Sequence, residues 1–184
     1  PLMVQSGSTT ATANLNYALE HADLFNVPNP ITMGTIYRPF ASFGGVGMTL
    51  ALIIATLWVG RSKASRRIAG LSLFPGLVNV SSPVLIGWPV MLNPIMLLPF
   101  LITPLINMAI AWTAIRLHLM PPSVYTVPAT TPGPLIAFLG TNGNLVALLV
   151  AVLCLVISVF IYVPFVRLAE TINLESAKVG GHHD

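Results

Sequence analysis

Charged side chains are scarce in this sequence: eight Lys and Arg and five Asp and Glu make up 7% of 184 residues, whereas a soluble domain carries about 25%. Residues 68–115 and 117–166 contain no charge at all, and each stretch exceeds the roughly 20 apolar residues that cross a bilayer. The scarcity excludes an ordinary soluble globular protein and predicts a multi-pass membrane protein. The length leaves room for about three or four crossings, few for a complete solute transporter.

Cysteine is nearly absent too. The single Cys154 excludes an internal disulfide framework and a Cys-rich metal site, and its apolar surroundings favour a packing role. His182 and His183 lack supporting ligands, so no metal and no other cofactor is expected. The chain begins at Pro1 with no signal-peptide pattern, and we expect it to have been cut from a longer protein.

Three apolar segments are predicted to cross the membrane: residues 41–60, 94–115 and 144–166. Three glycines open the first segment, and an unbroken apolar core follows them. Pro99 and Pro104 predict kinks in the second segment. The third is the clearest, because it carries no charge and is rich in Leu, Val and Ile.

Half of the basic residues follow the first crossing: Arg61, Lys63, Arg66 and Arg67. Placing each at the bilayer centre would cost about 2.5–3.5 kcal/mol, so they mark the end of that crossing. Their position between apolar segments favours a cytoplasmic loop over a nucleic-acid surface. A hairpin returning to the same side and two further crossings then place Arg167 and Lys178 in the cytoplasm as well, in agreement with the positive-inside rule.

Two further apolar segments, residues 68–92 and 119–142, are interrupted by proline, glycine and short polar residues. Such backbone is tolerated at membrane depth only where it is buried in protein or lines a cavity. We therefore predict two re-entrant hairpins, in which Pro83 and Pro132 are structural breaks.

The N-terminal 40 residues are the main polar region besides the tail. Within residues 10–25, Leu15, Ala18, Leu19 and Ala22 follow helical spacing, which predicts an amphipathic helix lying at the membrane interface and ended by Pro28 and Pro30. The predicted fold is therefore all-α: a polytopic membrane protein with about three transmembrane helices, two re-entrant hairpins and this interfacial helix. Its parts are residues 1–40, a membrane region 41–168 and a polar cytoplasmic tail 169–184.

The sequence contains no pattern of soluble catalysis, since the acids lie only in the terminal regions. The hairpins instead carry neutral hydroxyl and amide side chains: Asn79, Ser81, Ser82 and Asn93 in the first, Thr130, Thr131, Thr141 and Asn142 in the second. Broken segments that meet near the midplane form substrate sites in many transporters, and neutral groups suit a hydroxyl-rich solute such as a sugar. Alternatively, these side chains bond backbone carbonyls and only let helices pack closely.

Four stretches carry a resemblance to a known family: residues 43–50 (FGGVGMTL), 73–94 (LFPGLVNVSSPVLIGWPVMLNP), 127–139 (VPATTPGPLIAFL) and 157–165 (ISVFIYVPF). In these stretches, and in their order, the sequence resembles the membrane permease component, enzyme IIC, of the lactose/cellobiose/chitobiose branch of the bacterial phosphotransferase system. The resemblance covers most of residues 30–168 and only the C-terminal part of the family's domain.

The resemblance implies a homodimeric permease in the bacterial cell membrane, whose C-terminal half binds a disaccharide between re-entrant hairpins. The implied partners are IIB and IIA. The sugar is phosphorylated from a phosphocysteine on IIB, so no phosphorylated residue is expected in this chain. The implied substrate-binding residues are Asn79, Ser81, Ser82, Asn93, Thr130 and Thr131. The family's Gly-Ile-His-Gly segment belongs upstream of Pro1, and the N-terminal half of the permease is a further expected partner. No nucleic acid is implied.

Two positions depart from the family's pattern. Ser82 stands where the family has the glutamate of an Asn-Glu-Pro motif that binds sugar hydroxyls, and Ala129 stands where a tryptophan is usual. A charge-assisted hydrogen bond contributes about 1.5–3 kcal/mol and a neutral one about 0.5–1.5 kcal/mol, so sugar affinity or specificity is expected to differ.

Two hypotheses follow. The first is a sugar-specific permease component that binds a cellobiose-, chitobiose- or lactose-like sugar. The alternative is a degenerate IIC-like membrane protein that serves as a sensor or interaction surface, with transport lost or altered.

Overall fold

A computed structural model describes residues 2–87 and 94–180 of the chain, and every regular element in these ranges is helical. The prediction of an all-α fold is confirmed. The elements are α1 (Leu2–His21), η1 (Met33–Tyr37), α2 (Arg38–Ala41), η2 (Val46–Met48), α3 (Thr49–Val59), α4 (Lys63–Leu77), α5 (Ser82–Gly87), α6 (Pro94–Arg116), α7 (Gly133–Gly140) and α8 (Leu145–Gly180).

Three helical segments among the described residues are long and apolar enough to cross a membrane: Met33–Val59, Pro94–Arg116 and Leu145–Ile172. They correspond to the three predicted crossings. The first begins eight residues before the predicted start at 41, because η1 and α2 continue directly toward the glycine-rich turn.

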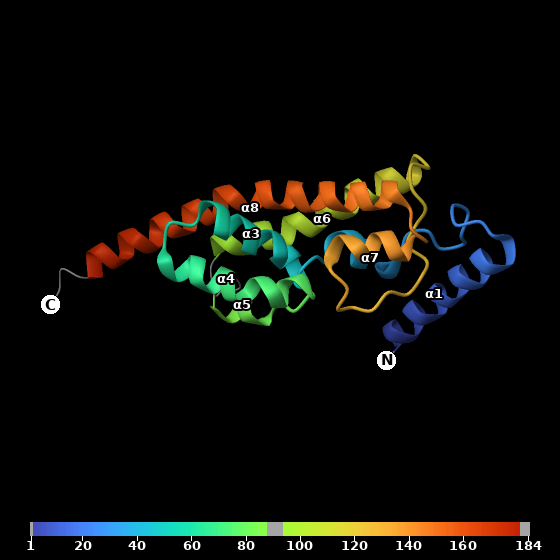
Figure 1. The fold of residues 1–184 in the computed structure, drawn as a ribbon, viewed down its shortest axis with the longest axis horizontal. Coiled ribbons are helices and arrows are strands. Elements are labelled where there is room, and N and C mark those ends of the chain that lie inside the picture. The colour runs from blue at the N-terminus through green and yellow to red at the C-terminus, as the bar shows by residue number, and fades with distance from the viewer. Residues whose placement is uncertain (1, 88–93, 181–184) are drawn as a thin grey trace.

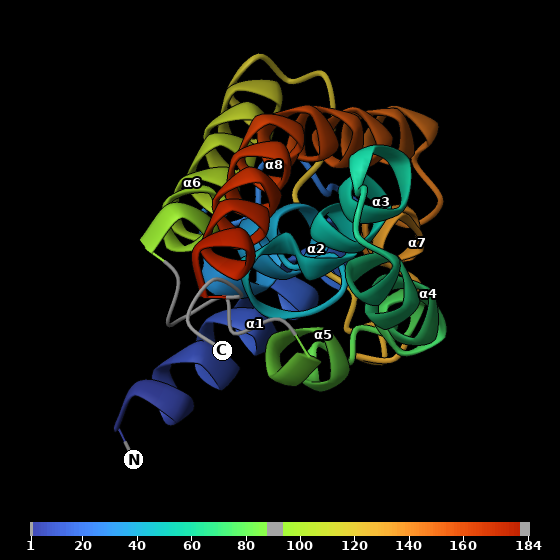
Figure 2. The ribbon, with the colours of Figure 1, turned by 90° about the vertical axis from the view of Figure 1, so that its left-hand side faces the viewer.

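The long helices α6 and α8 run side by side along the molecule, and α3 packs against α8 (Figure 1). Viewed along the long axis, α6 and α3 flank α8, while α4 packs against α3 and α5 packs against α4 (Figure 2). Helix α7 packs against both α2 and α8. Helix α1 and the loop between α6 and α7 lie at the end of the molecule opposite α4 and α5 (Figure 1).

The first crossing is not one continuous helix, and its glycines form an irregular turn before the predicted apolar core. Gly44, Gly45, Gly47 and Met48 have φ values of 79°, 100°, 72° and 58°, a region that glycine adopts without steric cost and other residues avoid. Regular α-helix therefore begins only at Thr49. The crossing consists of two short helical pieces separated by an irregular turn.

The first predicted hairpin, 68–92, is a helix and a turn followed by a short helix. Three of the four basic residues, Lys63, Arg66 and Arg67, lie inside α4 rather than in a loop, because Ser62 caps its N-terminus. Pro75 does not break α4, which continues to Leu77. The chain turns at Asn79 before α5 starts at Ser82, and residues 88–93 lie outside the described part.

The N-terminal helix differs from its predicted bounds. It runs from Leu2 to His21, and a left-handed residue at Ala22 (φ 51°) ends it, so Pro28 and Pro30 are not needed as terminators. Asp23 accepts hydrogen bonds from the Asn26 amide (2.6 Å) and the Phe25 backbone N–H (2.8 Å). These bonds, the Asn26 one foremost, lower the pKa of Asp23 below its usual value.

Only part of the predicted apolar face of α1 is covered. Ala18 packs with Val27 and Val124, and Leu15 lies partly buried beside them. Leu19 remains 66% exposed. Helix α1 is thus attached to the loop that follows α6, rather than packed along its whole predicted face.

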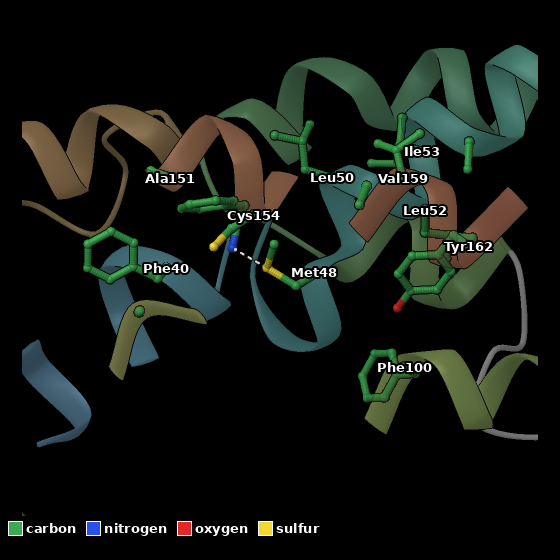
Figure 3. Close-up of a cluster of buried hydrophobic side chains, with 14 of the residues drawn as sticks. Phe40, Met48, Leu50, Leu52, Ile53, Phe100, Ala151, Cys154, Val159 and Tyr162 are labelled. Carbon is green, nitrogen blue, oxygen red and sulfur yellow. Dashed lines mark hydrogen bonds between the residues drawn. The ribbon is translucent and has the colours of Figure 1, made fainter. Parts of the chain in front are cut away.

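The main core joins α2, the irregular turn, α3, α6 and α8. Phe40, Met48, Leu52 and Cys154 are fully buried in it (Figure 3). Tyr162 of α8 is also fully buried, and its hydroxyl donates to the Gly47 carbonyl oxygen. This bond satisfies one backbone group that the irregular turn leaves without a helical partner.

A polar contact links the two long helices inside this apolar interface. The Asn107 amide donates to the Ser158 hydroxyl at 2.8 Å, and Ser158 donates to the Cys154 carbonyl oxygen at 2.6 Å. Asn107 and Ser158 are both fully buried. Interhelical bonds of this kind fix the rotation and register of membrane helices.

Candidate functional site

Asn79 joins three segments that are far apart in the sequence. Its Oδ1 accepts the Gly44 backbone N–H at 2.9 Å, while its Nδ2 donates to the Ala129 and Thr131 carbonyl oxygens at 2.8 and 2.7 Å. One amide side chain therefore connects the turn after α4, the break in the first crossing and the loop before α7. The two predicted polar clusters meet through it.

The local backbone explains why asparagine occupies this position. The N–H groups of Asn79 and Val80 bond the Gly76 and Pro75 carbonyl oxygens at the end of α4, at 3.2 and 2.9 Å. Asn79 itself has a left-handed φ of 62°, which asparagine tolerates better than most residues because its short polar side chain bonds locally. The turn directs the amide toward the other two segments.

The glycine-rich break lies directly against this turn. A Cβ built on Gly45 would lie 2.9 Å from the Ser81 hydroxyl oxygen and 3.1 Å from the Asn79 carbonyl oxygen. A side chain at position 45 would therefore push the hairpin turn away. On the other side of the break, the Thr49 hydroxyl donates to the Gly44 carbonyl oxygen, and this bond holds the turn on the first residue of α3.

The loop before α7 supplies the third part. The Thr131 N–H donates to the Pro128 carbonyl oxygen at 3.1 Å, and this bond closes a tight turn. Pro132 occupies the N-cap position of α7, where its ψ of 135° is extended. Gly133 packs so closely against the Phe43 ring that a Cβ there would lie 2.7 Å from it. The loop is thus fixed beside the glycine-rich break.

The predicted binding residues fall into two groups. Asn79, Ser81 and Thr131 are half-buried at the junction, whereas Ser82 and Thr130 are exposed beside it, at the start of α5 and in the loop. Asn93 lies outside the described residues. Pro83 stands in the first turn of α5, and Pro132 stands immediately before α7. Thr141 instead bonds the Ala137 carbonyl oxygen of α7 at 2.8 Å, the packing role that the alternative interpretation assigned to such groups.

Gly44 and Gly45 are missing from the predicted binding residues. The sequence places them in the opening turn of a crossing but does not indicate that this turn contacts Asn79. The sequence feature that could have indicated this contact is the cluster of glycines in FGGVG. Several glycines close together in an apolar segment indicate that another backbone approaches closely.

The junction is neutral. Of the five acidic residues in the sequence, none lies between Asp23 and Glu170, and no group of three His, Cys, Asp or Glu gathers anywhere in the described ranges. The junction presents hydroxyls, one amide and irregular backbone between apolar helices. Such groups donate hydrogen bonds to uncharged polar solutes and accept hydrogen bonds from them. None of these groups is suited to acid–base catalysis.

Comparison with known proteins gives a consistent result. The family described as "Phosphotransferase system, EIIC" matches residues 1–104. A "PTS system cellobiose-specific EIIC component" of Lactococcus lactis is 41% identical over 134 residues, which are 73% of this chain and 27% of that protein. A "PTS system lactose-specific EIICB component" of Staphylococcus aureus is 32% identical over 167 residues, 89% of this chain and 28% of that protein.

A solved structure shows the same fold. The crystal structure of ChbC, the IIC component from the N,N'-diacetylchitobiose-specific phosphotransferase system, aligns with a TM-score of 0.82 at 27% identity. The alignment covers 92% of this chain and 39% of ChbC. The chain thus spans less than a third of the two curated relatives named above.

Proposed function

This chain belongs to the EIIC family of the phosphotransferase system, and on that basis we propose that it forms part of a sugar-specific membrane permease. The proposed substrate is a disaccharide or short oligosaccharide of the cellobiose, lactose or chitobiose type. The names of the relatives and of the solved structure support this class. Because the chain spans less than a third of the two curated relatives, binding and translocation are proposed for the whole permease, to which this chain contributes its part of the sugar site.

The observation that carries the proposal is the Asn79 junction. Three broken segments meet at one amide, and Ser82 and Thr130 extend exposed hydroxyls beside it. Broken helices that meet inside a membrane protein supply the hydrogen-bonding groups of many transporter sites. We assign sugar binding to Asn79, Ser81, Ser82, Thr130 and Thr131, together with Asn93.

Three architectural features belong to the same proposal. Residues 68–87 of the first predicted hairpin and residues 119–142 belong to re-entrant hairpins, α1 lies at the membrane interface, and residues 41–168 form the C-terminal part of the transport domain. The exposed apolar side chains of Leu71 and Phe74 on α4, 72% and 76% exposed, support a hairpin immersed in lipid or covered by the rest of the permease. Residues 169–184 are assigned to the cytoplasm.

The proposed partners follow from the family. A IIB protein, which receives its phosphoryl group from IIA, phosphorylates the transported sugar. The name EIICB of one relative denotes a chain in which the IIC and IIB components are combined. The remaining part of the permease covers the hairpins, and the complete protein is a homodimer in the bacterial cell membrane.

Binding of radiolabelled cellobiose, lactose and N,N'-diacetylchitobiose to the full-length protein tests the proposal. We expect saturable binding of at least one sugar, and Asn79→Ala to weaken it at least tenfold, because it removes the three internal hydrogen bonds, of about 0.5–1.5 kcal/mol each, that hold the junction together. Asn16→Ala is the matched control, since Asn16 is exposed on α1, and it should bind like the parent. No saturable binding of any of the three sugars would refute the proposed function.

Ser82 provides a second test that does not depend on the stability of the fold. Its hydroxyl is exposed, so Ser82→Ala should leave the thermal transition unchanged while it lowers sugar affinity about three- to tenfold. Ser82→Glu restores the family's acidic group, and it should tighten binding or change which sugar is preferred. Unchanged affinity in both variants would remove Ser82 from the site.

A further inference from the structure

A polar cavity of about 470 Å³ lies at the end of the molecule that holds α1 and the loop after α6. None of the predicted sugar-binding residues lines it. Its walls come from α1, from η1 and the residues on either side of it, from residues 123–127 and from α7. The polar side chains that the argument uses are Asn14, Thr32, Thr35, Arg38, Tyr125 and Thr126. This volume lies within the range of small-molecule sites in proteins.

Two walls of the cavity are fixed by internal hydrogen bonds. The Asn14 amide both donates to the Asn29 carbonyl oxygen (2.7 Å) and accepts the Asn29 N–H (2.9 Å), which holds α1 on the segment before η1. Thr32 and Thr35 bond each other in a capping box at the start of η1. These polar side chains are therefore already oriented before any ligand arrives.

The loop wall is equally constrained. The N–H groups of Val124 and Tyr125 both donate to the Gly140 carbonyl oxygen, at 2.8 and 3.0 Å. Ser123 packs so tightly on Gly140 that a Cβ there would lie 2.0 Å from the Ser123 hydroxyl oxygen. The cavity is thus formed by rigid segments, which lowers the entropic cost of binding a ligand.

Three polar side chains of the cavity have unused hydrogen-bonding capacity: Arg38, Tyr125 and Thr126. Within the described ranges, no hydrogen bond or ion pair involves the side chains of Arg38, Tyr125 or Thr126. No acidic side chain lines the cavity, so the Arg38 charge has no counter-ion there. A guanidinium offers five donors in a planar fork, hydroxyls both donate and accept, and an aromatic ring covers an apolar ligand face.

We propose that this cavity is a second carbohydrate-binding subsite, separate from the Asn79 junction, in which Arg38 donates to sugar hydroxyls beside the Tyr125 ring. Sugar hydroxyls accept from the guanidinium and donate to the Thr126 oxygen, and the absence of acidic lining residues leaves the Arg38 fork available. The inference rests on the proposed function for its ligand class. The subsite lies at the end of the molecule opposite α4 (Figure 1).

Protection of an introduced cysteine tests the subsite directly. Thr126→Cys places a thiol in the cavity, and Thr130→Cys places one beside the Asn79 junction. Each variant of the full-length protein is alkylated with a maleimide, with and without cellobiose, lactose or N,N'-diacetylchitobiose. The protein without either substitution gives the background labelling, and mannitol at the same concentration controls for non-specific solute effects. We expect sugar to slow alkylation of both thiols at least threefold.

The source of protection at position 126 is then examined. Arg38→Met keeps an apolar stem but removes the fork, and it should abolish protection of Thr126→Cys while that of Thr130→Cys remains. Arg38→Lys keeps the charge without the fork and should retain part of the protection. Arg67→Met is the matched control, because Arg67 is an exposed arginine on α4 outside this cavity, and it should change nothing.

The outcomes separate the two proposals. Protection of Thr130→Cys alone overturns the second subsite and leaves the proposed function intact. Protection of Thr126→Cys alone, lost in Arg38→Met, supports the subsite and refutes the assignment of the Asn79 junction. Protection at position 126 that persists in Arg38→Met, or that Arg67→Met removes equally, overturns the inference, and so does the lack of protection at both positions.

Discussion

The first and last membrane-crossing segments solve the same physical problem in opposite ways. In Met33–Val59 the helix is broken by a glycine-rich turn, and 72% of its most apolar 18-residue stretch is buried inside the protein. In Leu145–Ile172 the helix is continuous through Pro164, and only 33% is buried. The broken segment is the protected one.

Backbone hydrogen bonding explains this difference. A continuous helix satisfies its own N–H and C=O groups and can face lipid on most of its surface, whereas an interrupted one needs partners from neighbouring segments. Helix α8 supplies such a partner, because the Tyr162 hydroxyl bonds the Gly47 carbonyl oxygen. Its own outer face exposes large apolar side chains such as Leu149 (67%) and Phe160 (59%). The continuous helix thus shields the broken one, and the broken one contributes Gly44 to the Asn79 junction.

Gly47→Ala should produce the largest loss of stability, because it attacks the break itself. A Cβ at Gly47 would lie 2.2 Å from two carbons of the Phe100 ring, at a φ of 72°. Left-handed strain and overpacking each cost about 1–3 kcal/mol, so the free energy of unfolding should fall by at least about 2 kcal/mol. The measurement is the thermal transition of the full-length protein in detergent.

Gly70→Ala is the matched control for that variant. Gly70 lies in α4, and a Cβ there meets nothing within 4 Å. Alanine is preferred over glycine in a helix by about 0.5–1 kcal/mol, so this variant should be as stable as the parent or slightly more so. Equal transitions for the two variants would mean that the glycine-rich turn is not tightly packed.

Glu170→Ala should have an intermediate effect, because Glu170 ties the two regions together. This side chain of α8 is only 3% exposed, and it accepts the Arg61 N–H at 2.5 Å and the Ser62 N–H at 3.4 Å in the turn between α3 and α4. Loss of a charged acceptor costs about 1.5–3 kcal/mol. Denaturant unfolding should show that loss, together with faster hydrogen exchange at the Arg61 amide.

Two further substitutions define the cause of that effect. Glu170→Gln keeps an acceptor without the charge and should cost less, about 0.5–1.5 kcal/mol. Thr171→Ala, at the adjacent exposed position, should change stability by no more than about 0.5 kcal/mol. If Glu170→Ala matched Thr171→Ala, the carboxylate would not anchor the turn.

Leu149→Ala should have the smallest effect, because it alters the exposed face of α8. We expect a change within about 0.5 kcal/mol, compared with about 2–5 kcal/mol for Leu52→Ala at a fully buried position of α3. Thermal unfolding of both variants in detergent makes the comparison. A loss above about 1.5 kcal/mol at Leu149 would indicate that other parts of the permease cover this face.

Much of the fold is predictable from local features of the sequence. The ends of the crossings follow from charge: Arg61 closes the first and Arg116 the second, because ionised side chains are expensive in hydrocarbon. The sequence also indicates breaks around Asn79 and before α7. Pro75 lies inside α4, so a proline in an apolar segment does not by itself mark a break, because such prolines are tolerated in membrane helices.

The candidate site was predictable as two clusters but not as one junction. Asn79 and Thr131 stand out because polar residues are rare in apolar segments, and the family resemblance draws attention to both. Their contact joins positions 52 residues apart, and no local pattern encodes such a pairing. The cavity around Arg38 was not predicted at all, because α1, the start of the first crossing and the segment that follows α6 form it together.

The sequence by itself determined the membrane-spanning segments and their helical nature, since apolar length and scarcity of charge are properties of a single stretch of chain. Only the tertiary structure decided which irregular backbone is buried and which polar groups meet. The Gly44 N–H can donate to the Asn79 side-chain oxygen only because α4 packs on α3 and places the hairpin turn beside the break. Hydrogen bonds over such separations depend on how whole helices pack, and that packing is a property of the assembled chain rather than of any segment.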